Sequence, residues 1–227
     1  MIQGIMEGLF DALYLSTVIT LGILMVKNHR GSRQHLLFGV MAITLGAGDA
    51  FHLAPRVYAL LTEGLAHHTA ALGTGKLITS ITMTVFYVLL YHVWRLRYQV
   101  RGRLGLTLII YGLAAARVVL CLLPQNAWTS PAPPLSFAIW RNIPFALMGL
   151  MIILLFHTSV KEQGDHAFRH MALTIILSFA FYIPVVLFAD RFPLVGILMI
   201  PKTCAYVWTV LIGYLDMRTA HKEKTIT

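Results

Sequence analysis

The stretch Pro193-Leu-Val-Gly-Ile-Leu-Met-Ile-Pro-Lys202-Thr-Cys-Ala-Tyr-Val-Trp208 is apolar enough for a membrane-spanning helix, yet it carries a lysine near its middle. An ammonium group at that depth is costly unless it faces a counter-ion or a polar cavity, so such a charge is a candidate functional residue. The remainder of the chain decides whether Lys202 is isolated or belongs to a larger set of intramembrane charges.

The whole chain has the composition of a membrane protein. Its 227 residues are 58% hydrophobic and only 12% charged, which lies far from the range of soluble domains. The net charge of +9 raises the question of nucleic-acid binding. However, the basic residues lie in short clusters between apolar runs, where they orient helices in a bilayer, and no nucleic-acid-binding motif is present. We therefore expect no nucleic-acid partner.

Apolar runs of about 20 residues, the length that crosses the hydrocarbon core, recur along the chain. They predict an all-α polytopic membrane protein in which residues 1–227 form one domain with seven transmembrane helices. The first run lacks the basic flank and the cleavage site of a signal peptide, so we expect it to be a retained helix. The expected spans are residues 8–26, 36–58, 70–94, 104–123, 140–159, 169–189 and 193–216.

The distribution of lysine and arginine predicts the orientation of these spans. Most of these residues lie in the loops after the first, third and fifth spans and in the C-terminal tail, whereas the opposite side has only Arg56 and Arg191 near its loops. Because basic loops stay in the cytoplasm, we expect an outer N-terminus and a cytoplasmic C-terminus. The expected location is a bacterial plasma membrane.

Once the direction of each span is fixed, the intramembrane charges share one depth. At about 1.5 Å per residue, all of them fall in the outer half of the bilayer, and Lys202 is the deepest. Groups this costly in lipid should face the interior of the bundle. We therefore expect a polar cavity that opens outward above an apolar cytoplasmic floor. The charged or titratable residues at this depth are Asp11, Asp49, His52, Arg56, Lys76, Arg117, Arg141 and Lys202.

The excess of cations in this set predicts an anionic ligand. Phosphate and carboxylate groups are the anions that arginine forks bind best, so we expect a membrane lipid, a phospholipid headgroup or a small organic anion as the partner. Ser80 follows Lys76, and Tyr206 follows Lys202, at one helical turn. The predicted ligand-binding residues are Lys76, Ser80, Arg117, Arg141, Lys202 and Tyr206. A structural alternative remains, in which single arginines reach the interface and Asp49 forms a buried ion pair.

The segment Gly48-Asp-Ala-Phe-His52-Leu-Ala-Pro-Arg56 resembles the Gly-Asp-x-x-x-Leu-x-Pro segment of the YhhN-type lysoplasmalogenases. Members of that family are small polytopic membrane proteins that hydrolyse the vinyl ether bond of lysoplasmalogens. The resemblance covers some ten residues and implies that Asp49 is an acidic active-site group. A carboxyl group and a histidine one turn apart suit the proton transfer and water placement of this reaction. Asp49 and His52 are therefore the candidate catalytic residues of a lysophospholipid or lysoplasmalogen hydrolase.

Three other functions remain open from the sequence. An outward-facing receptor or transporter for a small organic anion or lipid headgroup would use the same cavity without catalysis. Seven-span ceramidases hold zinc in the bundle, but their last span needs a histidine pair that this chain lacks. The segment from Pro201 to Tyr206 resembles the retinal-lysine segment of opsins, although Lys76 is unsuited to the place of a counter-ion. We expect no metal and no cofactor, and the sequence carries no signal for an oligomeric state.

Overall fold

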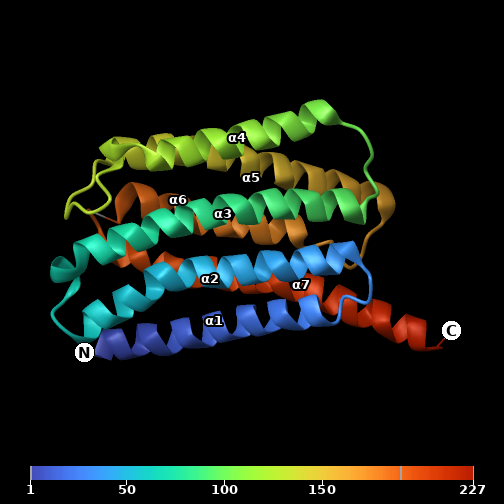
Figure 1. Ribbon diagram of the computed structural model, residues 1–227, viewed down its shortest axis with the longest axis horizontal. Coiled ribbons are helices and arrows are strands. Elements are labelled where there is room, and N and C mark those ends of the chain that lie inside the picture. The colour runs from blue at the N-terminus through green and yellow to red at the C-terminus, as the bar shows by residue number, and fades with distance from the viewer. Residues whose placement is uncertain (1, 190, 227) are drawn as a thin grey trace.

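Seven long helices make up most of the structure, with short 3-10 turns in some connections (Figure 1). This computed structural model describes residues 2–189 and 191–226, without the side chains at positions 3 and 224–226. Within this part of the chain there is no β-strand. The elements are α1 (Ile2–Lys27), α2 (Arg33–Leu61), η1 (Leu65–His68), α3 (Thr69–Arg97), α4 (Leu104–Leu122), η2 (Pro124–Asn126), α5 (Leu135–Gln163), α6 (Met171–Phe188), η3 (Pro193–Leu198) and α7 (Met199–Ile226).

All seven helices are long and apolar enough to cross a membrane. This confirms the all-α class and the prediction of seven helices that could span a membrane. Most helices extend beyond the predicted spans, because polar residues continue the helix past the apolar run. The last span differs most, since η3 covers its first residues and α7 begins only at Met199. The direction of insertion stays a prediction. We therefore refer below to the N-terminal end and the C-terminal end of the bundle, after the termini that lie there (Figure 1).

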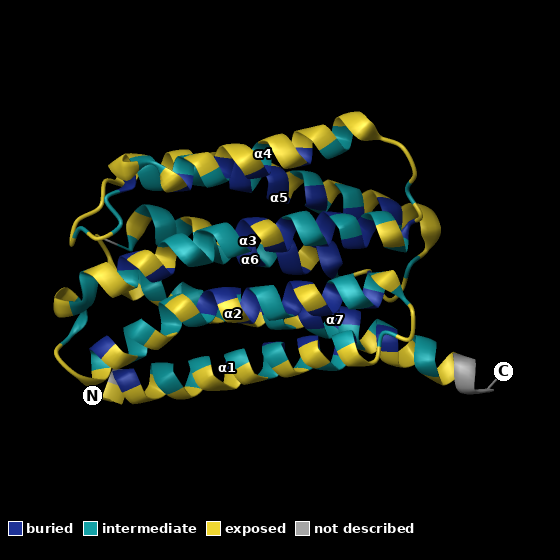
Figure 2. Ribbon diagram, viewed as in Figure 1, coloured by how far each residue is buried: buried dark blue, intermediate teal, exposed yellow. Residues whose placement is uncertain are grey.

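The helices close into a ring in chain order. Each helix contacts the next one along the chain, and α1 also contacts α7. Contacts of α3 with α5 and of α2 with α7 then cross the interior of the ring. Burial follows this arrangement, because the inward faces of the central helices are buried while α1 and α4 expose most of their surface (Figure 2). Residues from α2, α3, α4 and α7 thus meet in one interior.

Two glycines, Gly39 and Gly75, let α2 approach α1 and let α3 approach α2 closely. A Cβ atom on Gly39 of α2 would lie 2.8 Å from the Gly22 carbonyl oxygen of α1. A Cβ atom on Gly75 of α3 would overlap the backbone of Phe51 in α2. Small residues at such crossings are the usual means of tight helix packing in membranes. This packing fixes α1, α2 and α3 as a unit around the residues at Asp49 and His52.

Aromatic side chains fill the interior between α3, α5 and α6. The ring of Tyr87 lies 4.8 Å from that of Phe145 and 5.6 Å from that of Phe179, centroid to centroid. Tyr87 and Phe145 are almost fully buried. Edge-to-face contacts of this kind stabilise a core beyond the area that they bury. They also form a rigid backing for the charged side chains described next.

Candidate functional site

Asp49 lies in the interior on the middle of α2, between α1 and α7. Its Oδ2 atom accepts a 2.7 Å hydrogen bond from the hydroxyl of Tyr14 on α1. Both side chains are buried, with 8% of Asp49 and 3% of Tyr14 exposed. A hydrogen bond to an ionised carboxylate is among the stronger kinds in proteins. The sequence analysis did not predict Tyr14, although it follows Asp11 by three residues on the same helix face.

Lys202 lies opposite Asp49 on α7, one residue after Pro201. It is buried, and Asp49 is the acid within its electrostatic range. Its Nζ atom lies 5.1 Å from the ring centroid of Tyr182 and 5.3 Å from that of Tyr206. Aromatic faces at this distance attract a cation. Lys202 is therefore held between one carboxylate and two tyrosine rings, as the prediction that it faces the interior requires.

Arg117 on α4 is the second buried cation. Only 2% of it is exposed, and its guanidinium carbon lies 3.3 Å from the ring centroid of Phe145. Its Nε and Nη1 atoms have no hydrogen-bond partner among the described residues. Arg117 repels Lys202 electrostatically, and the polar groups around it are the hydroxyls of Tyr87, Tyr182 and Tyr206 and the thiol of Cys121.

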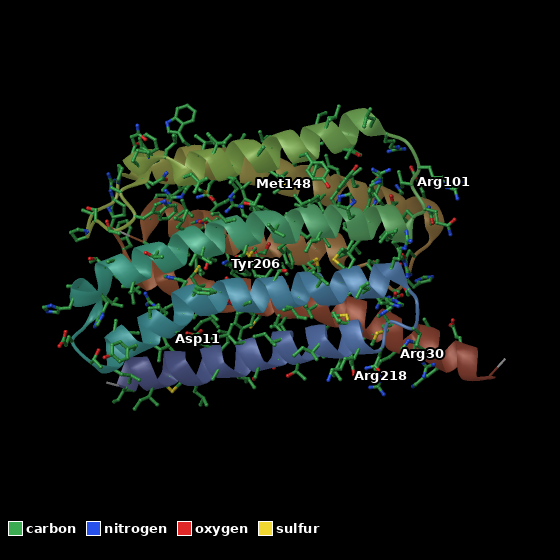
Figure 3. The ribbon with its side chains drawn as sticks, in the orientation of Figure 1. Asp11, Arg30, Arg101, Met148, Tyr206 and Arg218 are labelled. Atoms are coloured by element: carbon green, nitrogen blue, oxygen red, sulfur yellow. The ribbon has the colours of Figure 1, made fainter. Side chains whose placement is uncertain are left out.

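Asp49, Lys202 and Arg117 together form what we call the cationic core. It contains two basic side chains and one acidic side chain, all less than 9% exposed. Unpaired charge in the interior is strongly destabilising, so the ratio of two basic groups to one acid is the main feature of this site. Tyr206 borders the core and lies in the interior near its middle (Figure 3). Three of the predicted ligand-binding residues, Arg117, Lys202 and Tyr206, are thus brought together.

His52 and Lys76 lie beside the core, on the contact between α2 and α3. His52 forms a hydrogen bond with the backbone of Leu72, and Lys76 is electrostatically close to it. The Nδ1 atom of His52 is buried and has no hydrogen-bond partner among the described residues. Lys76 itself is exposed. Asp49 therefore faces α1 and α7, whereas His52 faces α3, and the two candidate catalytic residues have Lys202 as a common neighbour.

Arg141 and Ser80 lie at the edge of the cationic core, where they share neighbours with Arg117: Cys121 is close to all three side chains, and Tyr182 is close to Arg141 and Arg117. The Nη1 atom of Arg141 donates a 2.9 Å hydrogen bond to Asn126 Oδ1, and its guanidinium lies 4.3 Å from the Trp128 ring. Arg141 thus fastens the connection between α4 and α5. The hydroxyl of Ser80 donates to the Lys76 carbonyl one turn earlier in α3. Their role in ligand binding stays a prediction, and Cys121 is the neighbour that links them to Arg117.

The N-terminal end of α1 and α2 carries its own ion pair. Arg56 donates through Nε and Nη2 to the two carboxylate oxygens of Glu7, at 2.9 and 3.3 Å. Asp11 lies near this pair and within the electrostatic range of Asp49, and Figure 3 shows it toward this end of the bundle. Arg56 is therefore matched by an acid close to it. Its charge does not add to that of the cationic core.

Buried apolar side chains such as Phe38, Met41 and Leu45 of α2 lie between the cationic core and the other end of the bundle, and a set of paired charges lies beyond them. Arg97 binds Asp165 through Nε and Nη2, each at 2.9 Å, and Asp216 through Nη1 at 2.8 Å. His35 Nε2 lies 2.9 Å from the second oxygen of Asp216. Tyr98 donates a further hydrogen bond to Asp165. We call Arg97, Asp165, Asp216 and His35 the paired network. In the sequence, this network was indicated only by the acids Asp165 and Asp216 among the basic residues of this end.

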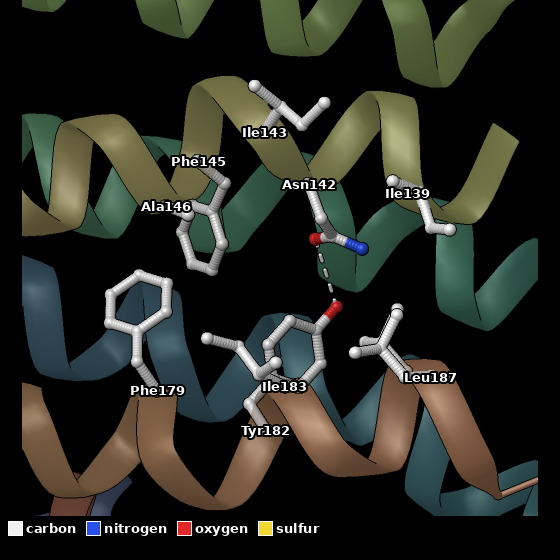
Figure 4. A pocket seen from close by; sticks show the side chains of 10 residues that line it. Ile139, Asn142, Ile143, Phe145, Ala146, Phe179, Tyr182, Ile183 and Leu187 are labelled. Atoms are coloured by element: carbon white, nitrogen blue, oxygen red, sulfur yellow. Dashed lines mark hydrogen bonds between the residues drawn. The ribbon is translucent and has the colours of Figure 1, made fainter. Parts of the chain in front are cut away.

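A groove of about 190 Å³ lies between α5 and α6 (Figure 4). Apolar side chains line it, together with Asn142 and Tyr182, whose hydroxyl donates a 3.2 Å hydrogen bond to Asn142 Oδ1. Phe145 and Tyr182 are part of this lining and also touch Arg117 and Lys202, respectively. The groove and the cationic core therefore share a wall.

The described residues contain no group of three or more His, Cys, Asp or Glu side chains that could hold a metal ion. Comparison with protein-family models, with curated proteins and with solved structures finds no match to this chain. The local resemblance around Asp49 thus stays a prediction from ten residues. The chemistry of the cationic core has to be argued from its own geometry.

Proposed function

We propose that this chain is an integral membrane protein whose cationic core binds an anionic group of a lipid or a small organic molecule. One observation supports this above the others. Lys202 and Arg117 are both buried and within electrostatic range of each other, whereas Asp49 is a buried acid in range of Lys202 alone, and two nitrogens of Arg117 have no hydrogen-bond partner among the described residues. A guanidinium and an ammonium in one interior are suited to a phosphate or carboxylate, which would supply negative charge.

The same proposal includes the orientation predicted from the basic loops. With the N-terminus outside, the cationic core lies in the outer half of the bilayer, and the paired network lies near the cytoplasmic surface. The basic residues Arg30, Arg101 and Arg218 lie at the C-terminal end of the bundle (Figure 3). Their position agrees with the bias of lysine and arginine toward the cytoplasm. We propose a bacterial plasma membrane as the location.

Anion binding is tested by the thermal stability of the purified protein in phosphatidylcholine nanodiscs. Methyl phosphate should raise the unfolding temperature, because a ligand at 100 times its Kd stabilises the folded state by about 2.7 kcal/mol. Methanol at the same concentration is the uncharged control. The Arg117→Met variant should lose the response, whereas Arg218→Met, which removes an exposed arginine of α7, should keep it. An equal response of wild type and Arg117→Met would contradict the proposal.

Hydrolysis of a lysophospholipid or lysoplasmalogen is a second candidate function at the same site. It is favoured by a buried acid, Asp49, with His52 nearby, since the His52 Nδ1 atom is buried and has no hydrogen-bond partner among the described residues. In vinyl ether hydrolysis an acid protonates the alkene carbon, and water adds to the resulting cation. The hemiacetal then breaks down to an aldehyde and an alcohol. Asp49 in its protonated form would donate the proton to carbon, and its carboxylate would take back the proton that is released when the water oriented by His52 adds.

Release of fatty aldehyde from a lysoplasmalogen in mixed micelles tests this second function. The Asp49→Asn variant should lower the rate by about 100-fold or more, the usual contribution of a positioned acid. Asp165→Asn, at the other end of the bundle, is the matched control. Aldehyde release that survives Asp49→Asn would contradict the assignment. Anion binding without any product would instead favour the receptor or transporter.

A further inference from the structure

The groove between α5 and α6 opens on the outer surface of the bundle, where lipid chains would lie. Ile139, Ile143 and Ile183 line it and are 39%, 43% and 45% exposed, so they form its rim. Deeper in, its lining includes Phe145, only 3% of which is exposed. The groove therefore runs from the lipid-facing surface toward the interior (Figure 4).

Two aromatic rings separate the groove from the cationic core. Phe145 lines the groove, and the guanidinium of Arg117 lies over its ring at 3.3 Å. Tyr182 also lines the groove, with Lys202 Nζ 5.1 Å from its ring centroid. The end of a hydrocarbon chain in the groove would therefore be separated from Arg117 by the ring of Phe145 and from Lys202 by the ring of Tyr182.

Each of the two helices that form the groove contains a proline beside it. Pro144 precedes Phe145 in α5, and Pro184 follows the groove residue Ile183 in α6. Each proline removes a backbone hydrogen bond of its helix and makes bending easier at that point. The hydroxyl of Tyr182 is held by a single 3.2 Å hydrogen bond to Asn142, a side chain of the opposite helix. Small displacements of α5 and α6 would break this contact and separate Tyr182 from Phe145.

We propose that the groove is a lateral entry and chain-binding site for a single-chain anionic amphiphile. Its hydrocarbon chain lies between α5 and α6, and its terminal oxyanion passes between Phe145 and Tyr182 to Arg117 and Lys202. This inference rests on the proposed function and extends it, because it names the class of ligand and the route from the bilayer. The complementarity is one of charge and polarity: an apolar groove leads to a centre with excess positive charge.

Binding of two radiolabelled probes to the protein in phosphatidylcholine nanodiscs tests this inference. Dodecyl phosphate has the chain and the anion, whereas methyl phosphate has only the anion. Unlabelled dodecanol, which has only the chain, serves as a competitor. Ala146→Trp places an indole in the groove, since Ala146 is part of its lining. Leu154→Trp is the matched control, because Leu154 lies two turns further along α5, is 54% exposed and is not part of the lining.

Ala146→Trp should weaken dodecyl phosphate binding by about tenfold or more, the loss expected when roughly two methylenes are no longer buried. Its binding of methyl phosphate should be unchanged, and Leu154→Trp should bind both probes like the wild type. Dodecanol should compete less well than unlabelled dodecyl phosphate. Arg117→Met should weaken both probes, with Lys202→Met as its replacement if that variant is not recovered folded. Ile183→Trp fills the groove from α6 if Ala146→Trp does not fold.

The possible results separate the two claims. If Ala146→Trp binds dodecyl phosphate like the wild type while Arg117→Met weakens both probes, the groove inference is wrong and the proposed anion site stands. Equal weakening of both probes by Ala146→Trp also overturns the groove inference, as does competition by dodecanol equal to that by dodecyl phosphate. If Arg117→Met changes neither probe, the proposed function itself is wrong.

Discussion

The bundle contains two charged regions that treat the same residue type in opposite ways. In the paired network, Arg97 makes three hydrogen bonds to two carboxylates, and His35 Nε2 lies 2.9 Å from the remaining oxygen of Asp216. In the cationic core, Arg117 is more deeply buried, yet its Nε and Nη1 atoms have no described partner. A satisfied arginine connects helices. An arginine at greater depth, with two nitrogens unpaired among the described residues, is the feature on which the proposed anion site rests, because burial without a partner is costly.

The largest expected effect is the loss of Arg97. Arg97→Met leaves Asp165 and Asp216 facing each other without their shared cation, and breaking a buried ion pair from one side costs about 3 kcal/mol or more. Unfolding in detergent with increasing sodium dodecyl sulfate measures this change. Arg101→Met, in the exposed connection that follows α3, is the control and should change stability by less than about 0.5 kcal/mol. Equal stability of the two variants would break the comparison.

The next effect concerns the anchoring of the acid in the cationic core. Tyr14→Phe removes the hydroxyl that donates to Asp49, and hydrogen bonds to charged groups contribute about 1.5–3 kcal/mol. The same unfolding measurement should show a loss of about 2 kcal/mol. Tyr58→Phe is the matched control, since Tyr58 is 61% exposed on α2. If Tyr14→Phe is as stable as this control, Asp49 does not depend on Tyr14.

A smaller effect is expected from pH at the paired network. Burial raises the pKa of Asp165, but hydrogen bonds and charge attraction from Arg97 outweigh it and hold this pKa below its ordinary value of 3.8. A group with a lowered folded-state pKa stabilises the protein above its ordinary pKa. That contribution is lost as the pH falls through the folded-state pKa.

The difference in stability between the wild type and Asp165→Asn, measured from pH 6 down to pH 3, checks this expectation. The wild type should be the more stable protein at pH 6, and the gap should narrow as the pH falls below about 4. Asp216 keeps its own partners in both proteins. A gap that stays constant across this range would show that Asp165 does not titrate as the network requires.

The smallest loss of stability is expected from Arg117→Met, the substitution that contrasts most with Arg97→Met. Arg117→Met replaces a buried cation that lacks hydrogen-bond partners at Nε and Nη1 by an apolar side chain of similar length. Replacing buried ionic groups by apolar ones is often neutral or stabilising by about 1–4 kcal/mol, so stability without ligand should not fall and can rise. Replacement by methionine should therefore destabilise the protein at Arg97 but not at Arg117. A large loss at Arg117 would mean that this arginine has a structural role like that of Arg97.

The parts of this architecture that were predictable rest on helix geometry. Apolar runs of spanning length fixed the seven helices, and the rise per residue placed Asp49, Arg117 and Lys202 at one depth. Depth alone does not give direction around the helix axis. Arg141 lies at a similar depth, but its partner Asn126 is in the η2 connection and draws it out of the core. No sequence pattern states which loop side chain will compete for an arginine.

The paired network and the groove were not predictable for different reasons. Asp165 and Arg97 looked like ordinary loop and helix-end charges, and only the folded ring brings them beside Asp216 and His35. The groove arises from the shapes of side chains on α5 and α6, where Ala146 lies among larger residues. Contacts between elements far apart in sequence depend on the tertiary arrangement, which cannot be read directly from a single amino-acid sequence.

The helix α7 joins the two charged regions mechanically. Lys202 and Asp216 are 14 residues apart on it, which is about 21 Å along the axis and within about 40° around it. The helix continues unbroken between them, so a rotation that draws Lys202 away from Asp49 must also swing Asp216 past Arg97 and His35. The positions of Lys202 in the cationic core and of Asp216 in the paired network are thus coupled through one continuous helix.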